Sequence, residues 1–493
     1  MSSRSFNIET IFIFSATLRL NSLESIDILD SMCSHIRLDY LNNKLMRILP
    51  IYNKEINEDW ITNKIRFVYD SNLYQRLNYP LIKVNNSFIN ISWINAFNLF
   101  FISLYKYINK NVVLGSFSDY DSILNIKQFF NLLGTNIFFE SNINDFNSDF
   151  LNDIYTSLNL ENTKILLMVS LNLRLEMPIL NSKLLRKKEK ILFYSIGNVG
   201  YFYSNYFKYL GNNVLDIINF VYGRTILNKE LFNNFSFDLN VFNQKFKPNG
   251  LQVLIGQSFY FIKNSFMLYN IIKKYVNNNY IFSWCNNLFS NVGILNYLNI
   301  NHLKKFIFNN KDSSMYFLNN IDNYYFLKNI KKENNFIVYR GSFFDEGAKY
   351  SDLIFPSTTF FEENLNYKSF EGINVNTRKV VSTNFYNNKE FFFFFNMLKL
   401  KFFKSNLFSI INFKVVLKYF KFLYINFNNI NFVFDRNLLF KSNQLNNYKF
   451  FIENKIFNSI IINYYKTDVY SRNSKNISLA SLEYLKTIIT YIK

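Results

Sequence analysis

The chain has 493 residues, of which 49% are hydrophobic and 18% charged, and this balance excludes a disordered protein and leaves room for more than one structural unit. Its net charge of +20 accompanies an excess of Phe, Tyr, Asn, Ile and Lys that is typical of an AT-rich, for example organellar, genome, so the charge is weak support for nucleic-acid binding. The two cysteines, Cys33 and Cys285, exclude a disulfide framework and a site with four cysteine ligands from this chain.

The apolar stretches are too short or too interrupted for targeting or for a membrane span. Residues 11–14 are too few for the apolar core of a signal peptide, and no transit peptide is evident. The longest uncharged run, residues 275–303, is broken by asparagines that are costly in lipid. We therefore expect no transmembrane segment, and the missing transit peptide together with the AT-rich composition predicts synthesis inside an organelle.

Residues 1–24 are predicted to be a leader, and residues 25–80 a small unit that contains β-strands. Within this unit, Ile36–Tyr40 and Lys44–Leu49 have β character and are separated by Asn42 and Asn43, which tolerate the positive φ angles of a tight turn. The pattern predicts a β-hairpin, followed by helix and loop over Asn57–Tyr69.

Residues 81–388 are predicted to form an α/β domain. Short, continuously apolar strands alternate with helical stretches, and several of them end in a small residue such as Gly115, Ser170 or Gly341. This pattern is typical of a doubly wound parallel sheet covered by helices on both faces. The predicted strands are Val112–Leu114, Ile137–Phe139, Ile165–Val169, Ile191–Ser195, Val253–Ile255, Phe336–Tyr339 and Leu353–Phe355.

The remaining residues, 389–493, are rich in Phe, Lys and Asn and contain no motif. We expect a mostly helical tail.

A series of short motifs, in a consistent order, resembles one family. The matching segments are Ser25–Asp27, Met46–Pro50, Ile56–Ile61, Lys64–Phe67, Gln75–Leu77, Leu166–Pro178, Phe336–Pro356 and Glu362–Gly372. Together they resemble the molybdopterin-oxidoreductase-like part of the large iron–sulfur subunits of respiratory complex I (NADH:ubiquinone oxidoreductase). The resemblance implies Rossmann-like layers and a place in the matrix-facing peripheral arm of that complex.

The resemblance also implies what this chain lacks. In molybdenum enzymes the segment after Ser25 carries a cysteine cluster, and here only Cys33 remains. The family's upstream iron–sulfur domain is missing, which predicts a separate cysteine-rich polypeptide as a partner. We therefore expect no cofactor in this chain, with the iron–sulfur clusters and FMN held by partner subunits.

Isolated residues that could carry chemistry have simpler structural interpretations. One thiolate cannot hold a cubane cluster, so Cys33 and Cys285 are expected to be small, partly buried side chains. His35 lies two residues from Cys33 but has no second pair of ligands nearby, and a structural hydrogen bond is the favoured role. Gly197–Gly200 lacks the full phosphate-loop pattern and indicates an ordinary turn.

The charged candidates also lack catalytic partners. Neighbouring carboxylates, Glu362–Glu363 and Asp345–Glu346, do not face each other and favour ion pairing over acid–base catalysis. Arg174 and Glu176 are expected to position a strand exit, and the basic run Lys183–Lys190 to be a solvated face or a subunit contact. Other lysines of this kind are Lys328, Lys331 and Lys332. The sequence predicts no catalytic, cofactor-binding or metal-binding residue.

The function predicted from the sequence is that of a structural subunit in the peripheral arm of mitochondrial complex I, on the matrix side of the inner membrane. The complex as a whole passes electrons from NADH to ubiquinone, and this chain alone is expected to be non-catalytic. One alternative is an active molybdenum or tungsten oxidoreductase, which needs a metal ligand and glycine-rich pterin loops that are not visible. Another is a basic organellar RNA-binding protein, suggested by the net charge alone.

Overall fold

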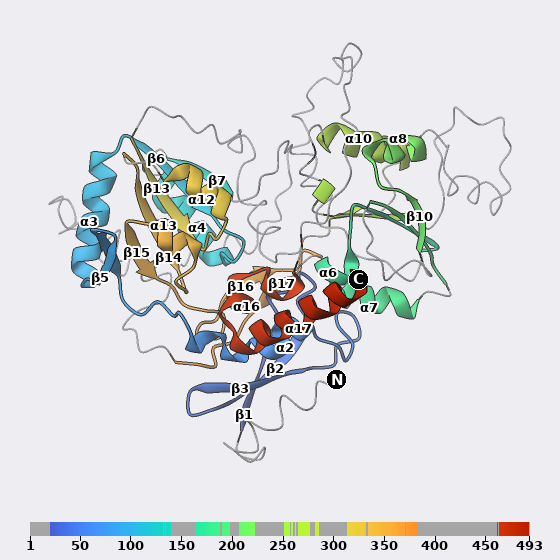
Figure 1. Cartoon of the computed structure of the whole chain (residues 1–493), viewed down its shortest axis with the longest axis horizontal. Helices are drawn as coiled ribbons and strands as arrows, with labels where there is room; N and C mark the ends of the chain where they lie inside the picture. The colour runs from blue at the N-terminus through green and yellow to red at the C-terminus, as the bar shows by residue number, and fades with distance from the viewer. Residues whose placement is uncertain are drawn as a thin grey trace, which may run out of the picture.

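The computed structural model describes residues 20–139, 163–197, 207–221, 251–284, 313–382 and 461–492, with short gaps inside these ranges. Two α/β units lie side by side, and the first strands meet the last helices beneath them (Figure 1). Cys285, His302, Lys332 and most of the predicted tail lie outside the described residues.

The lead unit is a three-stranded antiparallel sheet in the order β1-β2-β3. Its strands are β1 (Asn21–Ile26), β2 (His35–Leu41) and β3 (Lys44–Pro50). Asn42 and Asn43 have φ angles of 45° and 67°, so the predicted hairpin and its asparagine turn are confirmed. The short helices α2 (Asn63–Phe67) and η2 (Val68–Leu73) follow, and the hydroxyl of Thr62 caps α2 by accepting from Ile65 N.

The larger sheet has the strand order β5-β4-β15-β14-β13-β6-β7 among the described residues. Its strands are β4 (Leu81–Val84), β5 (Ser87–Asn90), β6 (Asn109–Leu114), β7 (Asn136–Phe139), β13 (Ser314–Asn319), β14 (Phe336–Gly341) and β15 (Leu353–Pro356). The strands from β15 to β7 are parallel, and the β4–β5 hairpin adds an antiparallel edge. All six residues of β13 are buried, as expected for a sheet covered on both faces.

Helices cover both faces of this sheet. They are α3 (Trp93–Lys106), α4 (Tyr120–Asn131), α12 (Tyr324–Ile330) and α13 (Glu346–Tyr350). On one face Phe100 of α3 packs edge to face against Phe317 and Phe355, with ring centroids 5.9 and 6.0 Å apart. On the other face Leu327 of α12 and Ala348 of α13 belong to a separate apolar cluster.

The smaller sheet is parallel throughout, in the order β10-β9-β8-β11-β12. Its strands are β8 (Ile165–Val169), β9 (Leu192–Ile196), β10 (Phe207–Gly211), β11 (Leu251–Ile255) and β12 (Phe282–Trp284). Its helices are α6 (Leu173–Glu176), α7 (Pro178–Arg186), α8 (Val214–Val221) and α10 (Ser265–Val276). The predicted doubly wound α/β fold is confirmed, and every predicted strand is present.

The last helices return to the beginning of the chain. The segment comprises η7 (Tyr464–Lys466), α16 (Val469–Asn473) and α17 (Lys475–Ile492). A two-stranded ribbon, β16 (Asn366–Lys368) and β17 (Asn374–Asn376), lies nearby (Figure 1). The described part of the tail is largely helical, as predicted. No helix among the described residues is both long enough and apolar enough to cross a membrane.

At the end of β6, the backbone of Gly115 lies very close to the backbone of Asn320. A Cβ atom on Gly115 would lie 2.0 Å from the carbonyl oxygen of Asn320, so neither backbone can yield cheaply. We expect Gly115→Ala to lower the free energy of unfolding by roughly 1–3 kcal/mol, the usual range for overpacking. Urea unfolding measures this, and Ala substitution of the exposed Ser87 on β5 is the control. Equal stability of the Gly115 variant and the wild type would show that the contact is not close in solution.

Candidate functional site

The lead unit and the larger α/β unit are joined by a buried ion pair. The Arg76 guanidinium donates from Nε and Nη2 to the two oxygens of Glu362, at 3.1 and 2.5 Å. It also donates to the carbonyl oxygens of Ser342 and Ser357, which follow β14 and β15. Both charged side chains are less than one-tenth exposed. The motifs that contain Arg76 and Glu362 are far apart in the sequence but meet beside the carboxyl ends of β14 and β15.

The same edge of the sheet holds a second polar network. Arg340 at the end of β14 is 1% exposed and donates to the amide oxygen of Asn319, at 2.9 Å. Asn319 in turn donates to the hydroxyl of Ser118, at 2.7 Å. In doubly wound proteins this edge is where ligands bind. Here Asn319 and Arg340, at the ends of β13 and β14, are both buried.

Aromatic residues also pack beside the carboxyl ends of these strands. Tyr470 of α16 contacts Phe117, Phe343 and Phe360, with ring centroids 5.0–5.5 Å apart. Burial raises the pKa of the Tyr470 hydroxyl above its usual range. The C-terminal segment thus packs an aromatic side chain between the lead unit and the strand exits.

A buried charged cluster lies where the C-terminal segment meets the lead unit. Lys64 of α2 is 3.2 Å from a carboxylate oxygen of Asp468 and also donates to the hydroxyl of Thr467. Asp468 caps α16 through Ser471 N, at 2.8 Å. Asp27 and Asp30, in the loop between β1 and β2, are buried within reach of the charge on Lys64.

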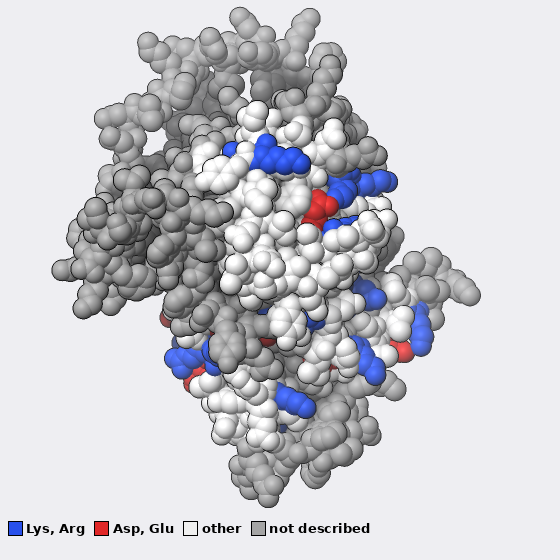
Figure 2. All heavy atoms as spheres, turned by 90° about the vertical axis from the view of Figure 1, so that its left-hand side faces the viewer, with Lys and Arg blue, Asp and Glu red and all other residues white. Residues whose placement is uncertain are grey.

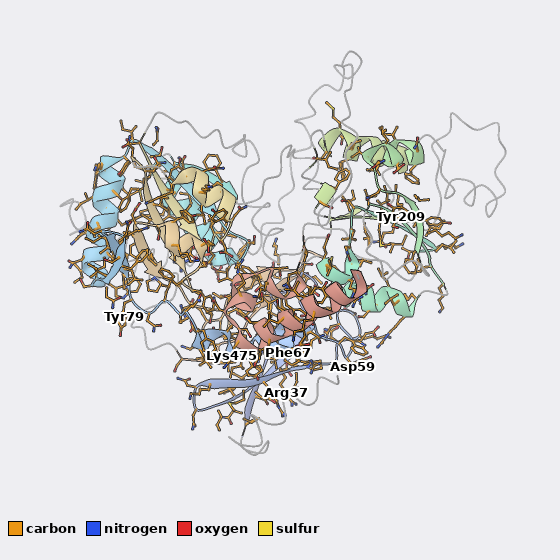
Figure 3. The ribbon with its side chains drawn as sticks, viewed as in Figure 1. Arg37, Asp59, Phe67, Tyr79, Tyr209 and Lys475 are labelled. Carbon is orange, nitrogen blue, oxygen red and sulfur yellow. The ribbon has the colours of Figure 1, made fainter. Side chains whose placement is uncertain are left out.

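A neighbouring carboxylate anchors the start of α17. Asp70 of η2 accepts from the hydroxyl of Ser474 and from Asn476 N, the latter at 3.1 Å. Figure 3 shows Phe67 and Lys475 close together at this contact, where the Ser474 hydroxyl also donates to the Phe67 carbonyl oxygen at 3.2 Å. A carboxylate at a helix N-terminus satisfies unpaired backbone donors and the helix dipole.

Both loop carboxyls are held in an environment that favours protonation. Burial raises the pKa of Asp30 to about 6, against backbone hydrogen bonds and Lys64, which lower it. Burial also raises the pKa of Asp27 well above its ordinary value, and the Asp30 charge adds to the effect. The loop therefore takes up protons more readily in the folded state than in the unfolded chain.

This difference predicts a pH-dependent stability. The Asp30 carboxyl has an ordinary pKa of 3.8 in the unfolded chain and about 6 when folded. The folded state therefore binds the proton more tightly, and stability from this group is lost as pH rises through 6. We expect the stability of the Asp30→Asn variant not to show this loss. Its free energy of unfolding relative to the wild type should therefore rise by roughly 3 kcal/mol between about pH 4 and 7. Urea unfolding across this range measures the difference.

Asp30→Ala is the matched control, because it removes the same titration but also the acceptor for Met32 N. Its stability should be lower than that of Asp30→Asn at every pH, with the same flattened profile. A wild type and an Asn variant with parallel profiles would contradict the assignment of a proton to this carboxyl.

Two surface depressions lie near these contacts. A groove of about 270 Å³ is lined by side chains of α2, α6, α7 and the C-terminal segment, including Trp60, Arg174 and Tyr464. A more open hollow of about 530 Å³ beside β16 and β17 is lined mainly by asparagines and by Arg378 and Lys379. Among the described residues, no group of three or more His, Cys, Asp or Glu side chains could hold a metal ion.

The candidates around Cys33 lie in or beside the loop between β1 and β2. Cys33 is fully buried with a φ angle of 57°, and its thiol donates to the carbonyl oxygen of Ser31 at 3.4 Å. A ring nitrogen of His35 lies 3.4 Å from the amide nitrogen of Asn53.

Gly197 has a φ angle of 111° and donates its N–H to the Gly211 carbonyl oxygen, at 2.8 Å, as in an ordinary strand exit. Residues 198–200 lie outside the described part.

The adjacent carboxylates take different partners. Glu363 accepts from the Thr358 hydroxyl at 2.6 Å, while Glu362 faces Arg76. Asp345 caps α13 through Ala348 N, whereas Glu346 pairs with Lys349 at 2.5 Å on the surface. In neither pair does the structure bring the two carboxylates to one point.

The remaining charged candidates lie on or beside α6, α7 and α12. On α7, Arg186 pairs with Glu58, and Lys183 donates to the Glu55 carbonyl oxygen. Arg174 lines the groove described above, and a carboxylate oxygen of the buried Glu176 accepts from Asn172 N at 3.5 Å. Lys328 lies on α12, and Lys331 after it pairs with Asp352.

Comparison with known proteins shows to which family this chain belongs. Residues 76–399 match the family model of molybdopterin oxidoreductases. The chain belongs to the molybdopterin oxidoreductase family. Residues 20–70 match the 4Fe-4S domain of the NADH-ubiquinone oxidoreductase NDSU1/NuoG-like type. The resemblance inferred from the sequence is confirmed.

Relatives of this family member are similar over most of its length. The chain is 33% identical to the NADH-ubiquinone oxidoreductase 75 kDa subunit of Acanthamoeba castellanii, over 73% of this chain and 53% of that protein. It is 32% identical to the subunit of the same name from Reclinomonas americana, over 73% and 54%. The chain spans about half the length of the curated relatives it matches. The structure resembles acetylene hydratase from Pelobacter acetylenicus with a TM-score of 0.55 and 14% identity, covering 77% of this chain and 69% of that one, which supports the fold alone.

The match over residues 20–70 corrects one expectation from the sequence. We expected no cofactor in this chain, and the match to a 4Fe-4S domain overturns that expectation, because an iron–sulfur cluster is what this family domain implies. The expectation relied on counting cysteines, whereas the family is defined by the whole segment. Cys33 is the single thiol within the matched residues, and a [4Fe–4S] cluster takes four ligands. The matched residues by themselves do not complete that set.

The described strand exits do not fit a molybdopterin cofactor. Such a ligand needs open backbone donors at glycine-rich turns. A Cβ atom on Gly115 or Gly256 would instead lie 2.0 or 2.2 Å from the carbonyl oxygens of Asn320 and Ser170. The chain's own backbone occupies these positions, and we assign no chemical step to such a group.

Sequence reasoning missed the residues that join the parts. Lys64 and Arg76 stood in motifs that carried the resemblance, but nothing indicated their partners, and Asp468 stood in a tail without any motif. A buried ion pair between residues several hundred positions apart has no periodic signal in one sequence. A lysine within an apolar helical stretch was the available hint for Lys64, because buried charges are almost always paired.

Proposed function

We propose that this chain is a subunit of respiratory complex I, located in its peripheral arm. The observation that carries the proposal is the order of modules, a NuoG-like 4Fe-4S domain at residues 20–70 followed by a molybdopterin oxidoreductase domain at residues 76–399. Support comes from relatives that are named as the 75 kDa component of NADH-ubiquinone oxidoreductase and, in Rickettsia prowazekii, as a component of NADH-quinone oxidoreductase.

Within that complex the chain is proposed to act as a scaffold. The Arg76–Glu362 pair joins the lead unit to the larger α/β unit, and the Lys64–Asp468 pair ties the C-terminal segment to the lead unit. At the strand exits of β6 and β11, the chain's own backbone approaches Gly115 and Gly256 closely. These features support a role in holding neighbouring redox subunits at fixed spacing, with NADH oxidation and ubiquinone reduction carried out by the complex as a whole.

We further propose a location on the matrix side of the mitochondrial inner membrane. Relatives whose names include the word mitochondrial support this, as does the composition typical of an AT-rich organellar genome. Synthesis within the organelle is part of the same proposal. The separate cysteine-rich partner expected from the sequence stays a prediction.

Native-gel separation of detergent-extracted organelle membranes tests the proposal. The gel is stained for NADH oxidation, and the stained band is analysed by mass spectrometry. We expect peptides of this chain in the large NADH-oxidising band, together with those of other complex I subunits and of a separate cysteine-rich chain. Migration of this chain alone, or with ribosomes, would overturn the assignment.

A further inference from the structure

The outward face of α3 has an unusual composition for a surface helix. The helix buries Ala96, Phe97, Phe100, Ser103 and Leu104 against the sheet, with helical spacing. The opposite face of such a helix normally carries charged residues. Here that face exposes Ile94, Ile102 and Tyr105 by 67%, 60% and 78%, and Ile108 just after the helix by 92%. We name these four residues the α3 patch.

Codon bias does not account for the α3 patch. The same AT-rich composition that supplies isoleucine also supplies lysine, and the surface helix α7 carries Lys183 and Arg186. On α3 itself the sole charged residue is Lys106, at its last position. Several exposed apolar side chains gathered on one face of a helix, here with the polar Asn95 and Asn98 between Ile94 and Ile102, are typical of an interaction site in soluble proteins.

The segment of the chain that carries the α3 patch contains basic residues but no acidic ones. Between Asp70 and Asp119 the chain contains no acidic residue. The basic residues of this interval are Arg76, Lys83, Lys106 and Lys110. Arg76 is paired with Glu362 inside the protein, and the nearby acidic residues Asp352 and Glu346 are paired with Lys331 and Lys349, so the three lysines add a net positive charge. Figure 2 looks onto the end of the molecule where α3 lies, and its described surface is mainly uncharged, with separate basic groups and few acidic ones.

The neighbouring strand edge distinguishes a protein partner from a lipid surface. Among the described residues, β5 is the outermost strand of the larger sheet, and it leads directly into α3. Its exposed residues include Ile89, at 49%. An edge strand presents backbone N–H and C=O groups that a protein can pair but that hydrocarbon cannot.

We propose that the α3 patch, with the edge of β5, is the docking surface for another protein subunit of the same complex, whose contact face is apolar at its centre and rimmed with Asp and Glu. The proposal rests on the proposed function. The apolar centre supplies binding energy by excluding water, and Lys83, Lys106 and Lys110 select an acidic rim.

Footprinting and cross-linking of the native assembly test this proposal. Hydroxyl-radical labelling is compared between the purified chain and the NADH-oxidising band from the gel. We expect Ile102 and Tyr105 to be labelled in the purified chain but, in the assembly, as little as the buried Phe100. A carbodiimide, which joins amines to carboxylates in contact, should link Lys106 or Lys110 to an acidic peptide of a different subunit.

A charge variant gives a second measurement. Replacing Ile102 by Asp puts a carboxylate in the centre of the contact while leaving the buried face of α3 intact. We expect it to weaken incorporation into the assembly by about tenfold or more. The control Ile373→Asp, at an exposed position between β16 and β17, should change incorporation by less than about twofold.

The outcomes separate this proposal from the proposed function. Absence of the chain from the NADH-oxidising band overturns both. Presence in the band with undiminished labelling of the α3 patch overturns the docking surface alone. A cross-link to a second copy of this chain, or protection that disappears on removal of lipid, also overturns it by identifying a different occupant.

Discussion

Replacing Asp468 by alanine is expected to lower the free energy of unfolding by about 3–5 kcal/mol, because it leaves the buried Lys64 ammonium without its carboxylate. The side chains are 7% and 1% exposed, so water cannot replace the lost partner. The substitution also removes the cap of α16. We expect the C-terminal segment to detach first, since η7, α16 and α17 contact the lead unit through this cluster.

Two measurements follow the effect. Urea unfolding gives the loss of stability, and limited proteolysis shows whether cleavage begins between residues 463 and 475. Asp468→Asn separates the causes, because an asparagine still caps the helix but carries no charge. The Asn variant should lose somewhat less than the Ala variant, by about 1 kcal/mol.

The control is Glu483→Gln, which breaks an exposed pair with Lys486 and should cost less than about 1 kcal/mol. The double variant Lys64→Met with Asp468→Asn should recover part of the loss, because neither partner of this pair then remains as an unpaired buried charge. A double variant less stable than either single one would show that the ion pair is not what holds the segment.

Replacing Arg76 by methionine is expected to be comparably severe, at about 3–5 kcal/mol. Methionine retains much of the apolar volume of the arginine side chain. It leaves the buried Glu362 without its ion-pair partner, and the carbonyl oxygens of Ser342 and Ser357 lose the hydrogen bonds that Arg76 donates. Because these carbonyls lie at the exits of β14 and β15, we expect the lead unit and the larger α/β unit to lose their fixed relation. Thermal unfolding should then change from one transition to two.

Arg76→Lys tests the geometry separately from the charge. A lysine keeps the positive charge but cannot form two parallel bonds to Glu362, so an intermediate loss is expected. The exposed pair of Lys349 and Glu346 is the control, and Lys349→Gln should cost less than about 1 kcal/mol. A single unchanged transition in Arg76→Met would contradict the role of this pair as the joint.

The sequence predicted the fold well where local patterns carry the information. The asparagine turn at Asn42 and Asn43 and the apolar strands with small exit residues followed from backbone preferences and burial, which are properties of a few adjacent residues. The strand β13 was missed because its residues, Ser314–Asn319, adjoin a stretch rich in Asn, Lys and Phe in which strand and loop look alike. Counting cysteines misjudged the lead unit, since residues 20–70 match a 4Fe-4S domain while containing Cys33 alone.

The sequence by itself determined the family, the alternation of strands and helices, and the scarcity of metal ligands, because each depends on residue type and spacing along the chain. The tertiary structure alone decided that Lys64 meets Asp468, that Arg76 meets Glu362, and that Tyr470 of the tail covers the strand exits. These partners are separated by hundreds of residues. A buried charge must find an opposite charge to offset its desolvation, but the chain's order does not say which one lies within reach until the fold has formed.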